Sequence, residues 1–279
     1  MSIRLAGITL ERAGRTIIRH AHLTVAPGEL VIVTGARGAG KSLLLAAAAG
    51  VVQPTEGTVE VGGRTLGSLR TSLRMVVRRN IGYLPSDPPF LRDESTLDIV
   101  MLALAVRGFA PGEAEKVARR SLTDVGADAW AARPINDLSP GERRLVAIAR
   151  ALCGPPPLVI LDEPTAGLDP GDLERLARTF AAARDAGAAL LCASNDAGLL
   201  DAVAGTGSRT GARHVRLVGG VLVGAHGSLR VVEDDETPTA PADVIDGFER
   251  SAAAHAGQGA HDTRATSHDL PAHTAREVS

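Results

Sequence analysis

A glycine-rich segment holds the most specific chemical pattern in this chain. It matches Gly-x4-Gly-Lys-Ser and consists of Gly35, Ala36, Arg37, Gly38, Ala39, Gly40, Lys41 and Ser42. Glycines let backbone N–H groups curl around phosphate oxygens, and a following helix adds positive potential. Lys41 is expected to reach the β- and γ-phosphates of a nucleotide, and Ser42 to bind Mg²⁺ through its hydroxyl. A glycine-rich turn that happens to precede Lys-Ser is the alternative, and the predicted strand before it and helix after it argue against that.

Two acids follow an apolar run further along the chain. Leu158–Leu161 is predicted to be a buried parallel strand, and Asp162 and Glu163 emerge at its carboxyl end. Open α/β sheets place their ligands at that edge. Asp162 is suited to hold Mg²⁺, directly or through water, and Glu163 is suited to polarise an attacking water. Taken alone, a strand that ends in a solvated acidic turn explains these residues equally well.

The pentapeptide Leu138–Glu142 lies between those two segments in the sequence. Ser139 and Glu142 have the spacing of a helix capping box, and Pro140 suits the first helical position. A helix N-terminus with a free hydroxyl and a glycine, Ser139 and Gly141, can also cap a γ-phosphate. If residues 35–42 already surround the same phosphates, that cap would have to come from a second copy of the domain.

Composition narrows the class of protein. The chain has 279 residues and a net charge of −2, which argues against a general nucleic-acid binder. No apolar run approaches the ~18 residues of a membrane helix, and Glu11-Arg12 comes too early for a signal peptide. We therefore expect a cytoplasmic protein whose membrane role comes through a partner. Cys153 and Cys192 are expected to be reduced and buried.

Strands and helices alternate, which predicts an α/β fold with a mostly parallel core sheet and helices on both faces. The predicted elements are short strands within 3–35, a helix over 43–49, strands and turns over 57–84, helices over 96–107, 113–125 and 139–152, a strand over 158–161, a helix over 173–186, a strand over 188–193 and a strand pair over 213–225.

The composition changes at about residue 232. An acidic run, residues 233–236, is followed by a stretch with few large apolar side chains, which predicts a disordered tail over 232–279. A metal or partner site is the alternative, but the histidines there lack the spacing of a tight metal site: His255, His261, His268 and His273.

In this order the segments resemble the nucleotide-binding subunits of ABC transporters, over about residues 3–225. The matched motifs are the Walker A loop (35–42), the signature (138–142), the Walker B acids and the D-loop (167–169). Residues 78–83, 96–100 and 141–150 look like the lipoprotein-release and macrolide-export branch. The resemblance implies a P-loop NTPase fold over 1–231, with an N-terminal antiparallel β subdomain and a helical subdomain at about 90–152.

The resemblance also implies ligands and partners. ATP and Mg²⁺ would be the cofactors. A second ABC cassette, identical or homologous, would complete a head-to-tail dimer with two ATP molecules between the subunits. The dimer would drive an integral membrane permease, as an exporter, from the inner face of the cell membrane.

Three positions depart from the family pattern. Ser86 stands where a metal-touching Gln is usual, and would need a water to reach the same oxygen. Asn195 replaces a His; it can donate a hydrogen bond to a γ-phosphate but cannot carry a proton. Ala13 replaces an aromatic that stacks on adenine, a role that the neighbouring Arg12 could take.

Two hypotheses of different kinds follow. The first is a transport-coupled ATPase in which Glu163 and Asn195 are catalytic. The second is a degenerate regulatory subunit that binds ATP and dimerises with little turnover, which the changes at Ser86, Asn195 and Ala13 favour. A soluble ABC protein of translation or DNA repair is less favoured, because the sequence shows neither a second cassette nor a long coiled-coil insertion.

Overall fold

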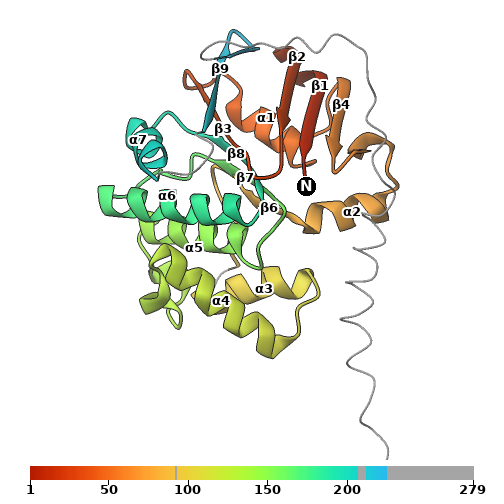
Figure 1. The fold of residues 1–279 in the computed structure, drawn as a ribbon. Helices are drawn as coiled ribbons and strands as arrows, with labels where there is room; N and C mark the ends of the chain where they lie inside the picture. The colour runs from red at the N-terminus through yellow and green to blue at the C-terminus, as the bar shows by residue number, and fades with distance from the viewer. Residues whose placement is uncertain (92, 207–211, 225–279) are drawn as a thin grey trace, which may run out of the picture. The chain divides into compact units, whose positions relative to one another are not determined.

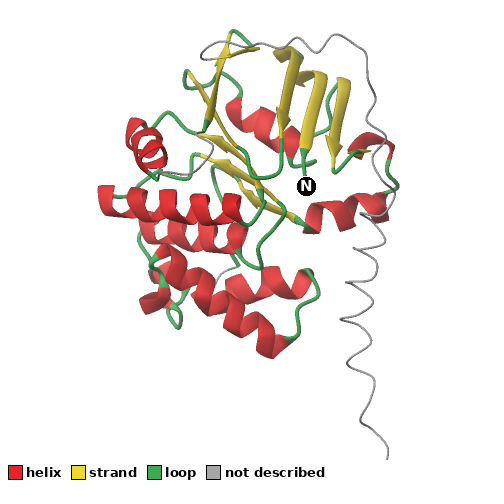
Figure 2. Ribbon diagram, viewed as in Figure 1, coloured by secondary structure: helices red, strands yellow, loops and turns green. Residues whose placement is uncertain are grey.

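The fold is described by a computed structural model that covers residues 1–91, 93–206 and 212–224. The predicted tail over 232–279, including its histidines, lies outside the described residues, so that prediction stays a prediction. The predicted fold class is confirmed: a mostly parallel sheet, a smaller antiparallel sheet and a layer of helices (Figures 1 and 2).

The core sheet has six strands in the order β10-β9-β3-β8-β7-β6. Its strands from β9 to β6 are labelled in Figure 1. All neighbours in it are parallel except the hairpin of β9 and β10. Its strands are β3 (Leu30–Gly35), β6 (Ile81–Leu84), β7 (Leu158–Asp162), β8 (Ala189–Ala193), β9 (Arg213–Val218) and β10 (Val221–Gly224).

Both faces of this sheet are buried, and β7 shows how. Its side chains alternate, so Val159 and Leu161 enter one hydrophobic core while Leu158 and Ile160 enter another on the opposite face. All four are fully buried. An uninterrupted apolar run is therefore what a central parallel strand requires, and it holds Asp162 rigidly at its end.

The second sheet is antiparallel, with four strands in the order β2-β1-β4-β5. These are β1 (Ile3–Arg12), β2 (Arg15–Val25), β4 (Glu56–Val61) and β5 (Arg64–Thr65). Helix α1 (Lys41–Ala48) packs in the same core as both sheets, with Leu44 and Leu45 fully buried. The helix that follows the glycine-rich loop is thus fixed by apolar contacts along its length.

Helices cover the opposite face of the core sheet (Figure 2). In α4 the buried residues Ala114, Ala118, Leu122 and Val125 recur at helical spacing and face α3 and α5. The helices of this layer are α3 (Thr96–Val106), α4 (Pro111–Val125), α5 (Pro140–Leu152), α6 (Pro170–Asp185) and α7 (Ala197–Gly205). The predicted helices here are confirmed to within about three residues at each end, and α7 is an addition.

One prediction was wrong. Residues 57–84 were expected to contain only strands and turns, but α2 (Thr71–Arg79) lies among them. No residue of α2 is buried; Leu73 and Val77, four apart, are only half-buried, and Met75 and Val76 are exposed. The apolar and charged residues of this nine-residue helix do separate onto different faces, so the sequence contained a helical pattern that the prediction overlooked.

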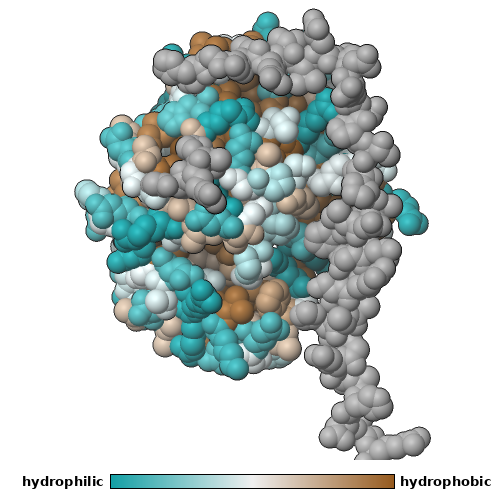
Figure 3. Space-filling model, viewed as in Figure 1, coloured by the Kyte–Doolittle hydropathy of each residue, from teal (hydrophilic) through white to brown (hydrophobic). Residues whose placement is uncertain are grey.

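The surface of the described part is mostly polar, with scattered apolar areas, one of them over α3 and α4 (Figure 3). Two apolar side chains of α3, Leu102 and Val106, are about half exposed. None of the helices in the described ranges combines the length and hydropathy that crossing a bilayer needs.

Candidate functional site

The predicted site residues that end or follow core strands gather at one edge of the core sheet, whereas Ser139 and Gly141 lie at the start of α5. Strands β3, β6, β7 and β8 are parallel, so their carboxyl ends lie at the same edge. Gly35 ends β3, Asp162 ends β7, Asn195 follows β8 and Ser86 follows β6. Parallel topology thus brings together residues up to 160 positions apart in the sequence.

The glycine-rich loop turns from β3 into α1. Gly38 and Gly40 have positive φ angles of 80° and 103°, which favour glycine. A Cβ on Gly40 would lie 2.7 Å from Ile17 Cγ2. Ala36 and Arg37 border the turn, where Arg37 is exposed and Ala39 N donates to Ala36 O at 3.1 Å. The backbone therefore has the tight curl that phosphate binding requires, with its rim open to solvent.

Lys41 joins the loop to the acids. Its side chain is 8% exposed, and Nζ donates to Gly35 O at 2.9 Å and to Ala36 O at 3.5 Å. Nζ also lies 3.5 Å from Glu163 Oε1. The ammonium group is held between the loop carbonyls and the carboxylate, so the two motifs predicted to share a nucleotide do meet.

Glu163 has a strained backbone. Its φ is +47°, a conformation that non-glycine residues rarely adopt and that costs about 1–3 kcal/mol. The Glu163 N–H donates to Ala193 O at 2.8 Å, which anchors the strained residue to the end of β8. Strain held in place by a neighbouring strand is typical of functional residues.

Asp162 is 1% exposed, and its Oδ1 has no hydrogen-bond partner among the described residues. A buried carboxylate oxygen without a donor is costly, and a cation would satisfy it. No cluster of three His, Cys, Asp or Glu side chains forms in the described part of the chain. A Mg²⁺ ion held by Asp162, the exposed Ser42 and phosphate oxygens fits this donor set.

Asn195 makes contacts that the sequence did not predict. Its Oδ1 accepts from Gly35 N at 2.9 Å, and its Nδ2 donates to Gly35 O at 2.7 Å. Both ends of the amide are therefore occupied by the first residue of the glycine-rich loop. The predicted contact with a γ-phosphate would have to share or replace these bonds, and it stays a prediction.

Ser86 is exposed, and the contacts that hold it in place are made to its backbone carbonyl. Arg144 of α5 donates from Nη1 to Pro85 O at 3.3 Å and from Nη2 to Ser86 O at 2.8 Å. Burial lowers the pKa of Arg144, while the nearby carboxylates of Asp162, Asp87 and Glu163 oppose that shift. Sequence reasoning missed Arg144; the Arg143-Arg144 pair in α5 was the available hint.

Ser139 begins α5 as the capping box that the spacing allowed. Its Oγ accepts from Glu142 N at 3.3 Å, and its own N–H donates to Glu142 Oε2 at 2.6 Å. The hydroxyl retains a proton that it can donate to a further acceptor. Its capping function is thus confirmed, and the role toward a nucleotide in a second copy stays a prediction.

Gly141 lies against the segment that follows the acids. A Cβ on Gly141 would lie 2.5 Å from the carbonyl oxygen of Gly167, closer than real Cβ contacts. Gly167 itself has a positive φ of 80°. The predicted signature and D-loop segments therefore pack backbone to backbone, which excludes any side chain at residue 141.

The predicted adenine-side residues lie at a hairpin. Arg12 ends β1, and the turn of Ala13 and Gly14 leads into β2. All three are exposed, and Ala13 has a positive φ of 50°. Arg12 is exposed to solvent, and a side chain that stacks on a base must be accessible in this way.

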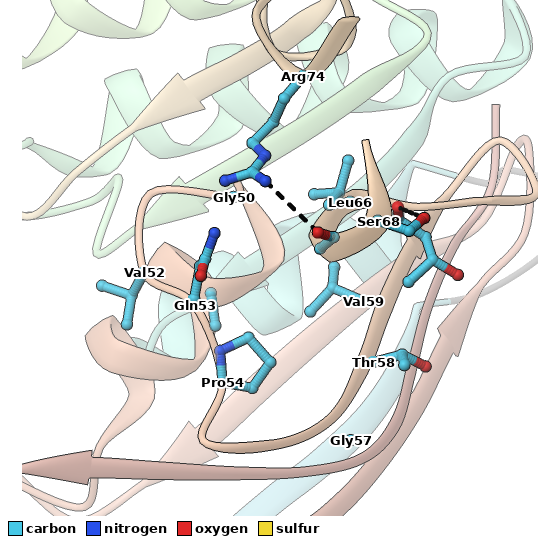
Figure 4. Close-up of a pocket in the computed structure, with 13 residues that line it drawn as sticks. Gly50, Val52, Gln53, Pro54, Gly57, Thr58, Val59, Leu66, Ser68 and Arg74 are labelled. Carbon is cyan, nitrogen blue, oxygen red and sulfur yellow. Dashed lines mark hydrogen bonds between the residues drawn. The ribbon is translucent and has the colours of Figure 1, made fainter. Parts of the chain in front are cut away.

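A cavity of about 400 Å³ lies elsewhere, between the end of α1, β4 and the 3₁₀ turn Leu66–Ser68 (Figure 4). Arg74 reaches it from α2 and donates to Gly67 O at 3.5 Å and to Leu69 O at 3.1 Å. None of the predicted site residues line it, so this cavity is separate from the candidate site.

Comparison with known proteins places this geometry in context. The family model described as "ABC transporter" matches residues 18–166. The lipoprotein-releasing system ATP-binding protein LolD of Chromohalobacter salexigens is 38% identical over 155 residues, 55% of this chain and 65% of that relative. The hemin import ATP-binding protein HmuV of Bordetella pertussis is 36% identical over 206 residues, 70% of this chain and 78% of that relative.

The relatives include importers as well as a LolD protein. The cobalamin import ATP-binding protein BtuD of Halobacterium salinarum is 34% identical over 187 residues, 66% of this chain but only 46% of that relative. The chain thus spans less than two thirds of some curated relatives, including the LolD protein. The LolD match confirms the resemblance to the lipoprotein-release branch, and the importers leave the direction of transport open.

A solved structure has the same fold. The dimeric bacterial ABC transporter cassette MJ0796 superposes with a TM-score of 0.71 at 25% identity, over 81% of this chain and all of that one. A second MJ0796 structure, a dimeric post-hydrolysis state bound to ADP and Pi, gives the same TM-score at 24% identity.

Proposed function

This chain belongs to the ABC transporter family, and on that premise we propose that it is an ATP-hydrolysing subunit that drives a separate membrane permease. One observation supports hydrolysis above all. Lys41 Nζ lies 3.5 Å from Glu163 Oε1, and the residue before Glu163, Asp162, has a buried oxygen without a partner among the described residues. These are the groups that would bind phosphate, hold a cation and activate water.

ATP binding would rest on the loop of residues 35–42. Its backbone N–H groups and the start of α1 would bind the phosphates, and Lys41 would turn from the loop carbonyls toward the β- and γ-phosphates. Asn195 holds Gly35 in place while this happens. Arg12, exposed at the β1–β2 turn, would stack on the adenine base.

Hydrolysis would depend on Glu163. Its strained backbone fixes the carboxylate at the sheet edge, where it can accept a proton from the attacking water. Lys41 would neutralise charge on the γ-phosphate. Asp162 and Ser42 would hold Mg²⁺, which supplies charge neutralisation of the phosphates when bound.

Two cassettes would close around the nucleotides. Ser139 and Gly141 of each copy would cap the γ-phosphate bound to the other copy, with a hydroxyl that still has a proton to donate. The dimeric state of the similar MJ0796 cassette supports this arrangement. The second copy is this chain or a homologous cassette.

A groove of about 390 Å³ offers a surface for the permease. It lies between α2 and the end of α3, and its lining includes the half-exposed Val51, Met75 and Val106. Arg78 and Arg79 contribute positive charge at the same place. We propose that a segment of the permease with both apolar and acidic side chains binds there. This contact would put the cassette at the inner face of the membrane.

Steady-state phosphate release, measured with Mg²⁺ and ATP, tests the proposal. The native protein should release phosphate, and Glu163→Gln should lower the rate by about 10²–10³-fold, as loss of a group that acts in the transition state does. ATP binding should be retained in the variant. Equal, background-level rates in both proteins would instead support the regulatory subunit with little turnover.

A further inference from the structure

The segment from Pro85 to Phe90, which includes Ser86, is neither helix nor strand. It joins the core sheet to the helical layer, because it leaves β6 and leads to α3. Two arginines of α5 bind its backbone. Since Ser139 is the N-cap of α5, one helix contacts both the segment after β6 and the predicted partner-facing site.

Arg144 makes a two-pronged contact at the start of this segment. Nη1 and Nη2 donate to successive carbonyls, those of Pro85 at 3.3 Å and Ser86 at 2.8 Å. A planar guanidinium group can bind two neighbouring acceptors at once, whereas the ammonium of lysine is a single point. The short Ser86 side chain is not part of this contact.

Arg150 binds the far end of the same segment. Its Nη1 donates to Pro89 O at 2.7 Å, and its guanidinium carbon lies 4.9 Å from the centre of the Phe90 ring. Arg150 is partly buried, and this burial lowers the pKa of its guanidinium group. The segment is thus held to α5 at two points.

Arg144 also interacts electrostatically with the carboxylates of the candidate nucleotide site. Asp162, Glu163 and Asp87 are the carboxylates near its guanidinium group. Binding of a nucleotide with a cation would change the net charge that Arg144 faces, whereas Arg150 is near Cys153 rather than these acids. Arg144 is therefore the arginine placed to respond to the nucleotide.

We propose that Arg144 is a positioning residue that links the nucleotide site of one copy to the signature helix that caps the nucleotide of the other. Arg144 holds the Ser86 segment to α5. When a nucleotide binds beside Asp162 and Glu163, the Ser86 segment and α5 would therefore move together. This inference rests on the proposed function, since it assumes that Ser139 faces a second copy.

Hydrogen–deuterium exchange on the full chain tests the link, with ADP compared with a non-hydrolysable ATP analogue. In the native protein the analogue should slow exchange in residues 35–42, in 84–91 and at the start of α5. In Arg144→Ala the loop at 35–42 should keep its response, while 84–91 should lose it. The analogue concentration for half-maximal dimer should rise about ten-fold, as expected for losing a charged hydrogen-bonded contact.

Arg119→Ala is the matched control. Arg119 lies on α4, in the same helical layer, and pairs with Glu115 where both side chains are about half exposed. The Arg119→Ala variant loses the same charge as Arg144→Ala, but its exchange at residues 84–91 should respond to the analogue as that of the native protein does. Arg144→Lys keeps the positive charge but loses the two-pronged hydrogen bonding of the guanidinium group, so protection of residues 84–91 by the analogue should be weakened. If circular dichroism shows that Arg144→Ala is unfolded, the response of Arg144→Lys at residues 84–91 is the test of the proposal.

The outcomes separate the two proposals. A native-like response at 84–91 in both Arg144 variants would overturn the positioning role. A native protein that shows no analogue-dependent protection at 35–42 and no dimer would overturn the proposed function itself. Loss of the 84–91 response in Arg144→Ala alone, with the loop response kept, supports the link.

Discussion

The side-chain amide of Asn195 bonds to both the N–H and the C=O of Gly35, 160 residues away in the sequence. Gly35 already pairs with Leu217 of β9, and Asn195 holds it from the β8 side, two residues beyond the last β3–β8 pair of Val33 with Ala193. The loop therefore begins from a fixed point, and the same carbonyl also accepts from Lys41.

We expect Asn195→Ala to weaken the binding of ADP and ATP by the same factor. Two neutral hydrogen bonds of about 0.5–1.5 kcal/mol each would be lost, which loosens the loop for either nucleotide. A group that contacts only the γ-phosphate would instead weaken ATP binding alone. Fluorescence titration with both nucleotides measures the ratio. Asn195→Asp, which sets a carboxylate oxygen against Gly35 O, should weaken both more strongly.

Asp162→Asn should stabilise the protein without metal while removing its response to Mg²⁺. The variant replaces a buried charge, one of whose oxygens has no partner among the described residues, with a neutral isostere, which is expected to raise the free energy of unfolding by about 1 kcal/mol in EDTA. The additional stabilisation by Mg²⁺ with ATP should disappear. Thermal unfolding with and without Mg²⁺ and ATP measures both effects. Asp124→Asn, at an exposed position on α4, is the control and should do neither.

Gly141→Ala should abolish ATP-dependent dimerisation while a single copy still binds ATP. The added Cβ would lie 2.5 Å from Gly167 O, so the backbone after the acids must move. Gly112 supplies the matched control, since it also follows a proline in the first turn of a helix and a Cβ added to it would meet nothing within 4 Å. Light scattering with ATP should show a dimer for Gly112→Ala; a dimer for Gly141→Ala as well would contradict the contact.

The two cysteines should be unreactive in the folded protein. Burial raises the pKa of the Cys153 thiol to about 11, and it raises that of Cys192 further, with Glu163 and Asp162 adding to the effect. Since the thiolate is the reactive form, a thiol reagent at pH 8 should label neither until the chain is denatured. Because the folded protein favours the neutral thiols, both cysteines contribute to the free energy of unfolding below pH ~8.5, the ordinary thiol pKa. This contribution is lost as the pH rises above that value toward the raised pKa values of the folded state.

Local features of the fold were predictable because a few adjacent residues determine them. The strand before Gly35, the helix after Lys41 and the cap at Ser139 each depend on apolar runs, glycine or a three-residue spacing. The burial of both cysteines followed from composition in the same way. Helix α2, nine residues long, was missed although its apolar and charged residues separate onto different faces.

The contacts between distant segments could not be predicted in this way. Asn195 with Gly35 and Arg144 with Ser86 join residues from different strands and helices, and only the order of the strands brings them together. Ser86 and Asn195 were identified as unusual positions, but their actual partners depend on backbone atoms. A backbone carbonyl is the same for every residue type, so it leaves no mark in a sequence.

The alternation of side chains in β7 has a consequence for how the chain unfolds. Because neighbouring residues of one strand enter separate cores, neither the helical layer nor the layer of α1 with the antiparallel sheet can detach without exposing the strand between them to water. The two layers should therefore lose their structure in a single cooperative transition, with amides of β7 and β8 among the slowest to exchange.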